Sequence, residues 1–142
     1  MPAEATSPDL VELTRLAFEA ANRRDLDAVI SFYASDAVFE GRMAGDNYEG
    51  RVAIRSFLED WFGAYEELEL KLEDVRDLGS GFVFAVVVQE GVLAGSAGRG
   101  RVGQREGWVF LWERGLIARH AALSTDIDEA RAAAEALAES RG

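Results

Sequence analysis

One histidine and one glutamate, set among aromatic residues, form the arrangement in this sequence that is best suited to chemistry. His120 is the only histidine in the chain, and Glu106 lies in the stretch that a hairpin would bring beside it. An imidazole oriented by a carboxylate can act as a general base, and burial can move its pKa in either direction. The alternative is a histidine that is hydrogen-bonded inside an apolar cavity and takes no part in chemistry, since no nucleophile accompanies it.

The face of the sheet on which His120 lies depends on the turn at residues 113–115. Gly115 suits the left-handed position of a three-residue loop. That loop would pair Trp112 with Leu116 and place Trp108 opposite His120, whereas a two-residue turn would move His120 to the other face. The three-residue loop predicts one shared face, with Glu106 diagonal to His120. Its members are Gln104, Glu106, Trp108, Phe110, Trp112, Ala118, His120, Ala122 and Ser124.

Aromatic residues could form the walls of a pocket around this histidine. They are Phe39, Trp61, Phe62, Trp108 and Phe110. Flat apolar side chains suit a ring-bearing ligand, although they serve equally well as core, the better interpretation for Trp61 and Phe62 on a helical stripe. Tyr33 and Tyr48 each carry a hydroxyl that could orient a substrate at the pocket mouth. A surface role is an equal alternative for Tyr48.

Composition excludes several other kinds of site. The chain has no cysteine and one histidine, so disulfides, thiolate catalysis and the usual zinc motifs are absent, and we expect neither a metal nor a cofactor. The net charge of −11 repels phosphate backbones and anionic lipid surfaces, so nucleic acid and membranes are not expected partners. No apolar run approaches the length of a bilayer span, and residues 1–7 lack the apolar region of a signal peptide. We expect a cytoplasmic protein.

Apolar periodicity predicts three helices in the first half. The first starts at Ser7-Pro8-Asp9 and continues through Ala21, the second is capped by Asp25 and runs to Tyr33, and the third spans residues 54–62. A short strand at 37–40 and a loop at 41–50 separate the last two. The length of 142 residues fits a single domain over residues 1–142, with residues 1–7 disordered.

The second half has the period of strands. Residues 68–72 alternate apolar and charged side chains, and residues 82–88 form a continuous apolar run. Two further strands follow at 108–112 and 116–124, and Thr125 or Asp126 caps a last helix through Leu137. The glycine-rich segment 94–103 is interpreted as a hairpin connection. Helices that precede an antiparallel meander predict an α+β fold with a curved sheet over the helices, and the open end of that cone is a natural ligand site.

Several motifs, in order, resemble the nuclear transport factor 2-like superfamily. Residues 16–36, with AANRRDLD at 20–27 and YASD at 33–36, resemble its opening. The YEGR motif at 48–51, GRGR at 98–101 and residues 108–115 are similar to its SnoaL-like branch. The resemblance covers nearly the whole chain. It implies a cystatin-like cone, a strongly curved and mainly antiparallel sheet packed on N-terminal helices, with a deep pocket and a homodimer.

The resemblance does not fix an activity, because the superfamily includes isomerases, cyclases, hydrolases, dehydratases and binding domains. Ala17, Gly41 and Trp108 occupy the positions of the three catalytic residues of its steroid isomerases, so that activity is not expected. The Asp/Arg/Asp core of its epoxide hydrolases has no counterpart. The comparison does place His120 among the pocket-lining residues.

Three hypotheses remain open. The first is an enzyme that transfers protons on an apolar ring-containing small molecule, with His120 as base and Glu106 as its orienter. The second is a binding domain with the same pocket and no chemistry. The third is a dimerisation or adaptor module that acts through the outer face of the sheet, which would then carry a large uncovered apolar patch.

Overall fold

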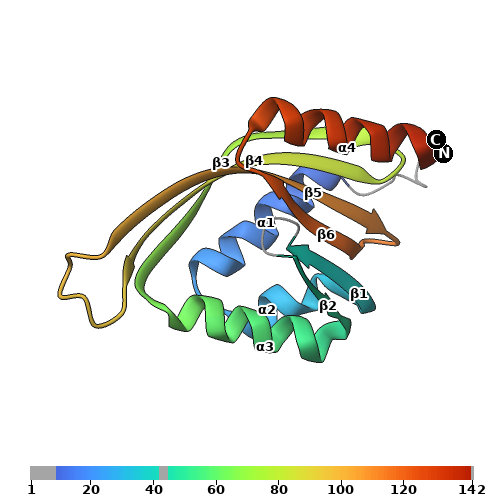
Figure 1. Cartoon of the computed structure of the whole chain (residues 1–142). Coiled ribbons are helices and arrows are strands. Elements are labelled where there is room, and N and C mark those ends of the chain that lie inside the picture. Colours follow the sequence, from blue (N-terminus) through green and yellow to red (C-terminus); the bar gives the residue numbers. More distant parts are fainter. Residues whose placement is uncertain (1–8, 42–44, 142) are drawn as a thin grey trace.

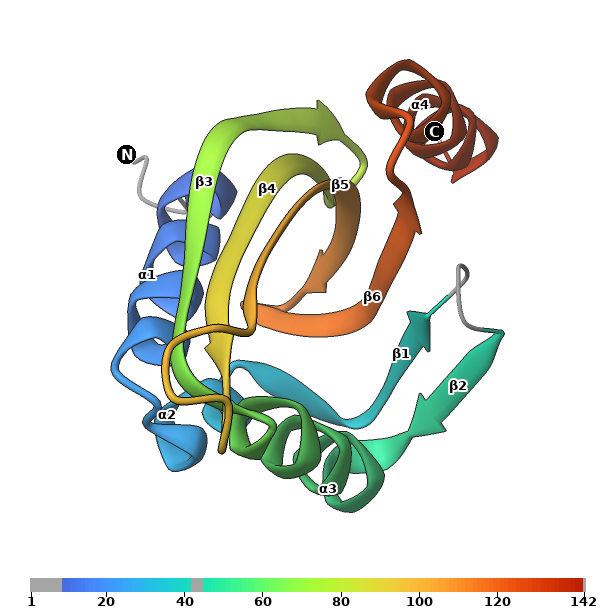
Figure 2. The same ribbon diagram turned by 60° about the vertical axis from the view of Figure 1, so that its left-hand side comes forward.

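Six strands form one sheet in the order β2-β1-β6-β5-β4-β3. The structure is a computed structural model and describes residues 9–41 and 45–141. Its strands are β1 (Tyr33–Gly41), β2 (Asp46–Glu49), β3 (Tyr65–Gly79), β4 (Phe82–Leu93), β5 (Arg101–Glu113) and β6 (Leu116–Ser124). All neighbours pair antiparallel except β1 and β6, which run parallel. Figure 2 shows how the sheet curls, with β3 and β2 at its two opposite edges.

In the described ranges, four helices accompany the sheet. They are α1 (Leu10–Asn22), α2 (Leu26–Ser31), α3 (Gly50–Gly63) and α4 (Ile127–Arg141). Asp9 caps α1 by accepting a hydrogen bond from the backbone N–H of Glu12. Ser7 and Pro8 of the predicted helix start lie outside the described residues, as do all of residues 1–7. Asp25 caps α2 as predicted. At α4 the cap is Asp126, whose carboxylate accepts from the N–H of Glu129.

The sheet divides the apolar core into two parts. α1, α2 and α3 cover the inner, concave face of the sheet, while α4 lies on the outer face, as Figure 1 shows. The alanines at 130, 134 and 138 form a smooth stripe on α4 that packs on the outer side of β4, β5 and β6. This arrangement is the predicted α+β fold of cystatin-like type. The chain's own α4 covers part of the outer face on which an adaptor surface was considered, over β4, β5 and β6.

Two elements differ from the sequence-based prediction. The second helix ends at Ser31, and Tyr33 begins a strand, because the backbone N–H of Ile117 in β6 donates to the carbonyl of Phe32 and starts the parallel pairing there. Residues 46–49 form the edge strand β2 within the predicted loop. Both features depend on pairing with distant strands, which periodicity within a short window does not show.

Candidate functional site

His120 lies in the middle of the inner face, between two phenylalanines on neighbouring strands. Across β1 it pairs with Phe39, and across β5 it pairs with Phe110. The Phe110 ring stacks on the imidazole at a centroid distance of 4.2 Å, and the Phe39 ring meets it edge-on at 4.4 Å. The side chain is 3% exposed. The sheet therefore buries this imidazole among aromatic rings.

The inner position of His120 results from a compensation between a turn and a bulge. Arg114 and Gly115 both have positive φ, at 55° and 80°, and form a two-residue turn that pairs Glu113 with Leu116, so the predicted three-residue loop is wrong. Alone, this turn would put His120 on the outer face. Ala118 is an extra residue between the pairs of Trp112 with Ile117 and Leu111 with Arg119. Such a bulge restores the alternation.

The bulge also corrects the predicted cross-strand pairs. His120 lies opposite Phe110, and Trp108 lies opposite Ala122. Ile117 takes the inner position that was assigned to Ala118, which instead packs with the α4 side of the sheet. The shared inner face of Trp108, Phe110 and His120 is confirmed, but their register is shifted by two residues from the prediction.

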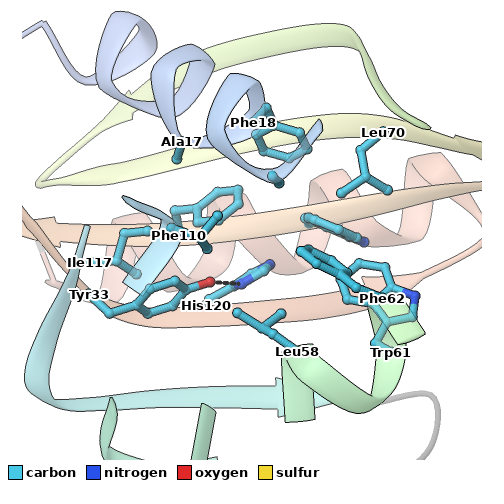
Figure 3. Close-up of a pocket in the computed structure, with 13 residues that line it drawn as sticks. Ala17, Phe18, Tyr33, Leu58, Trp61, Phe62, Leu70, Phe110, Ile117 and His120 are labelled. Carbon is cyan, nitrogen blue, oxygen red and sulfur yellow. Dashed lines mark hydrogen bonds between the residues drawn. The ribbon is translucent and has the colours of Figure 1, made fainter. Parts of the chain in front are cut away.

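Tyr33 orients the imidazole. Its hydroxyl lies 2.9 Å from Nδ1 of His120, and both side chains are buried (Figure 3). Arg51, at the start of α3, holds this tyrosine in place because its Nε donates to the Tyr33 carbonyl at 2.7 Å. Burial raises the pKa of the Tyr33 hydroxyl, so the phenol keeps its proton at neutral pH.

The second imidazole nitrogen, Nε2 of His120, is buried and has no hydrogen-bond partner. Burial lowers the pKa of His120 to about 3, and the ring is therefore neutral. If Tyr33 donates to Nδ1, one N–H at Nε2 is left unsatisfied. The opposite tautomer would leave two groups unsatisfied, the Tyr33 O–H and the Nε2 lone pair. The first arrangement costs less, so His120 presents a hydrogen-bond donor at Nε2.

An inner cavity of about 40 Å³ is lined in part by His120. Figure 3 shows its lining side chains, which come from α1, α2, α3 and the inner face of the sheet. They are Ala17, Phe18, Ala21, Val29, Tyr33, Leu58, Trp61, Phe62, Leu70, Trp108, Phe110, Ile117 and His120. Only Tyr33, His120 and the indole N–H groups among them are polar. The space accommodates a water-sized group, so a ring-bearing ligand must displace a wall residue. Trp61 on α3 is the residue best placed to move, because it is only half-buried.

Glu106 does not orient His120. The carboxylate accepts hydrogen bonds from the indole N–H of Trp108, at 2.7 Å, and from the side-chain amide of Gln104. It lines an adjoining outer cavity of about 220 Å³. Glu106 was predicted to be the diagonal neighbour of His120 because Trp108 was expected opposite His120. That prediction is wrong, since Phe110 lies opposite His120.

The other predicted ligand-binding residues divide between the two cavities. Tyr33 and Phe110 line the inner cavity, and Phe39 lines the outer one. Trp61 and Trp108 line both and form the shared wall. Tyr48 lines neither, because its ring stacks on Phe57 at 4.5 Å and supports the outer cavity from behind.

Sequence reasoning missed the bond between Tyr33 and His120, since it placed Tyr33 at the end of a helix. The tyrosine opens the YASD motif at 33–36, and this was the one signal that could have pointed to it. Within residues 9–41 and 45–141, no group of three or more acidic or histidine side chains is arranged to hold a metal ion. None of the helices formed by these residues is long and apolar enough to cross a membrane.

Comparisons with known proteins agree with this fold. The family model of the SnoaL-like domain matches residues 14–120. No curated protein matches the chain at a significant level.

Solved structures with the same fold superpose on most of the chain. A candidate polyketide cyclase from Xanthomonas campestris pv. campestris is 27% identical, with a TM-score of 0.67 over 79% of this chain and 87% of that one. A SnoaL-like candidate polyketide cyclase from Shewanella putrefaciens CN-32 is 17% identical, with a TM-score of 0.69 over 93% and 99%. A cystatin-fold protein from Novosphingobium aromaticivorans is 19% identical, with a TM-score of 0.70 over 81% and 97%.

Proposed function

Because the chain belongs to the family of SnoaL-like domains, and because its His120 lines an apolar cavity and has a buried nitrogen without a partner, we propose that it binds a ring-bearing small molecule through one oxygen acceptor. The observation that carries the proposal is the buried and unpartnered Nε2 of His120, which bears the hydrogen in the favoured tautomer. An unsatisfied buried donor costs about 1–3 kcal/mol, and a carbonyl oxygen in the cavity would remove that cost. The aromatic walls supply the contacts for the ring.

The ligand class is an apolar cyclic ketone or a related carbonyl compound. A charged acceptor such as a carboxylate would be desolvated without a cation near it, since the cavity walls are apolar apart from the neutral donors. A hydrocarbon ring would leave the imidazole unpaired. The similarity to a candidate polyketide cyclase supports the same class.

A matched pair of probes tests the proposal. 1-Indanone and indane share a ring system and differ at the carbonyl, and the fluorescence of Trp61 and Trp108 in the cavity wall reports their binding. We expect 1-indanone to bind about 3- to 10-fold more tightly than indane, as one neutral hydrogen bond provides. His120→Leu should abolish that preference. Equal affinities in the wild type, or a preference that survives in His120→Leu, would overturn the proposal.

Proton transfer by His120 is the second candidate, because Tyr33 holds the ring at Nδ1 and leaves Nε2 without a partner. A base with a pKa of about 3 is weak at neutral pH, however, and Nε2 must lose its hydrogen before it can accept a proton. Among the described residues that line the inner cavity, no carboxylate is present to act instead. The geometry therefore supports binding above catalysis.

Deuterium exchange separates these two functions without knowledge of the natural ligand. The α-protons of 1-indanone exchange slowly in D2O, and NMR follows their loss. If the protein only binds, the exchange rate with wild type will equal that with His120→Leu. An acceleration that disappears in His120→Leu would establish proton transfer and make the chain an enzyme.

A homodimer, which the family resemblance implies, is proposed here as well. Because α4 packs on the outer sides of β4, β5 and β6, the strand surfaces beneath this helix are not free to form the dimer contact. Light scattering during gel filtration measures the mass directly. A monomer at micromolar concentration would contradict the proposal.

A further inference from the structure

The outer cavity has a different chemistry from the inner one. Its walls include four aromatic side chains, Phe39, Phe57, Trp61 and Trp108, and its polar groups come from Glu106 and Gln89. The aromatic rings follow one another closely. Phe39 and Phe57 lie 5.0 Å apart between centroids, Phe57 and Trp61 lie 6.0 Å apart, and Trp61 and Trp108 lie 6.1 Å apart. One carboxylate thus stands beside a continuous aromatic wall.

Glu106 is a buried acid whose known partners are neutral. It is 8% exposed and accepts from the Trp108 indole and the Gln104 amide. Within the part of the chain that the structure describes, no lysine, arginine or histidine nitrogen lies within 4.0 Å of its oxygens. A carboxylate accepts about four hydrogen bonds, so its oxygens have capacity left. Burying a carboxylate is costly unless a cation accompanies it.

An organic cation would satisfy both parts of this cavity. The faces of tryptophan and phenylalanine attract ammonium groups through their quadrupoles, most strongly where water is excluded. A carboxylate at the same place supplies the counter-charge. The net charge of −11 raises the concentration of cations near the surface, and so favours their capture.

We propose that the outer cavity is a binding site for the ammonium group of an organic cation, with Glu106 as its counter-ion and Phe57, Trp61 and Trp108 as its walls. Because Trp61 and Trp108 also line the inner cavity, a single ligand can reach both sites once Trp61 moves. The ligand is then a cyclic carbonyl compound that carries an amine. This last statement rests on the proposed function, whereas the cation site itself does not.

Two probes of similar size, one cationic and one neutral, test the cation site. Tetramethylammonium and tert-butanol are similar in size and differ in charge, and the indole N–H signals of Trp61 and Trp108 in NMR titrations report binding. We expect the dissociation constant of tetramethylammonium to be at least 10-fold lower than that of tert-butanol. Equal dissociation constants, or no change in either indole signal, would overturn the inference.

Variants separate the local carboxylate from the overall charge. Glu106→Gln keeps the shape of the side chain and should weaken tetramethylammonium binding at least 10-fold, with tert-butanol unchanged. Glu66→Gln removes the same charge from an exposed position and should have little effect. Equal losses in the two variants would overturn the site. If Glu106→Gln does not fold, Trp61→Leu tests the site instead. This variant should weaken tetramethylammonium binding at least 3-fold, and an unchanged affinity would contradict the site.

The two proposals fail separately. Tetramethylammonium binding without a preference for 1-indanone over indane would overturn the proposed function alone. A preference for 1-indanone without tetramethylammonium binding would overturn the cation site alone.

Discussion

The Tyr33 hydroxyl lies 2.9 Å from Nδ1 of His120, and this bond links the first residue of β1 to the middle of β6. The two side chains are 87 residues apart in the sequence, and both are buried. The bond sets the tautomer of the imidazole and thereby decides which atom faces the inner cavity. Its removal should affect both stability and recognition.

Tyr33→Phe should destabilise the protein by about 1–3 kcal/mol, because it leaves Nδ1 of His120 buried without a partner. Urea unfolding measures the change. Tyr65→Phe is the matched control, since the Tyr65 hydroxyl accepts from Gln89 in a half-buried position where water can replace it. A loss no greater in Tyr33→Phe than in Tyr65→Phe would show that the buried bond is not important.

Stability should fall as the pH is lowered from 6.5 toward 3. Burial lowers the pKa of His120 to about 3, so in this window the unfolded chain binds a proton that the folded chain excludes. As the pH falls from 7 to 5, this difference in proton binding lowers the free energy of unfolding by about 2 kcal/mol. The wild type should lose that much relative to His120→Leu, in which carboxylates titrate alike but no imidazole does. A difference between the two proteins that stays constant with pH would contradict the low pKa.

Gly107→Ala should loosen α4 from the outer face of the sheet. A Cβ at this position would lie 2.3 Å from the Cβ of Ala130, and no side-chain rotation relieves a contact between two Cβ atoms. We expect a loss of about 1–3 kcal/mol in the free energy of unfolding. Gly103→Ala, on the same strand, meets its nearest atom at 4.0 Å and should change stability little. Similar unfolding curves for the two variants would contradict the close approach.

Asn22→Ala should detach the end of α1 from β3. The side-chain amide donates to the carbonyl of Leu70 and accepts from its N–H, at 3.0 and 2.8 Å. Loss of both bonds should cost about 2 kcal/mol and weaken ligand binding as well, since Leu70 lines the inner cavity. Asn47→Ala on exposed β2 is the control for both measurements. An Asn22→Ala protein as stable as this control would show that the two hydrogen bonds between Asn22 and Leu70 contribute nothing to stability.

The sequence predicts the order of elements well because each long element has its own periodicity. The stripe at residues 54–62 became α3, and the alternation at 68–72 became part of β3. Pairing between distant segments is harder to predict. Tyr33 continues the apolar pattern of α2, and only its contact with β6 makes it a strand residue.

The site shows the same limit. His120 was predicted on the inner face from a three-residue loop, and it lies there because a two-residue turn and a bulge at Ala118 compensate. Gly115 suits both turns, and an alanine gives no sign that it is the extra residue of a bulge. The error in register carried over to Glu106, which was assigned to the histidine and instead binds Trp108.

The most direct measurement for the central claim is ¹⁵N NMR of the histidine in tag-free protein. His120 is the only histidine, so its two ring nitrogens give the only imidazole signals. From pH 8 to pH 5 we predict a neutral ring with hydrogen on Nε2 and none on Nδ1, and a change at Nε2 when 1-indanone binds. A ring that titrates near pH 6.5, or that carries its hydrogen on Nδ1, would contradict the account.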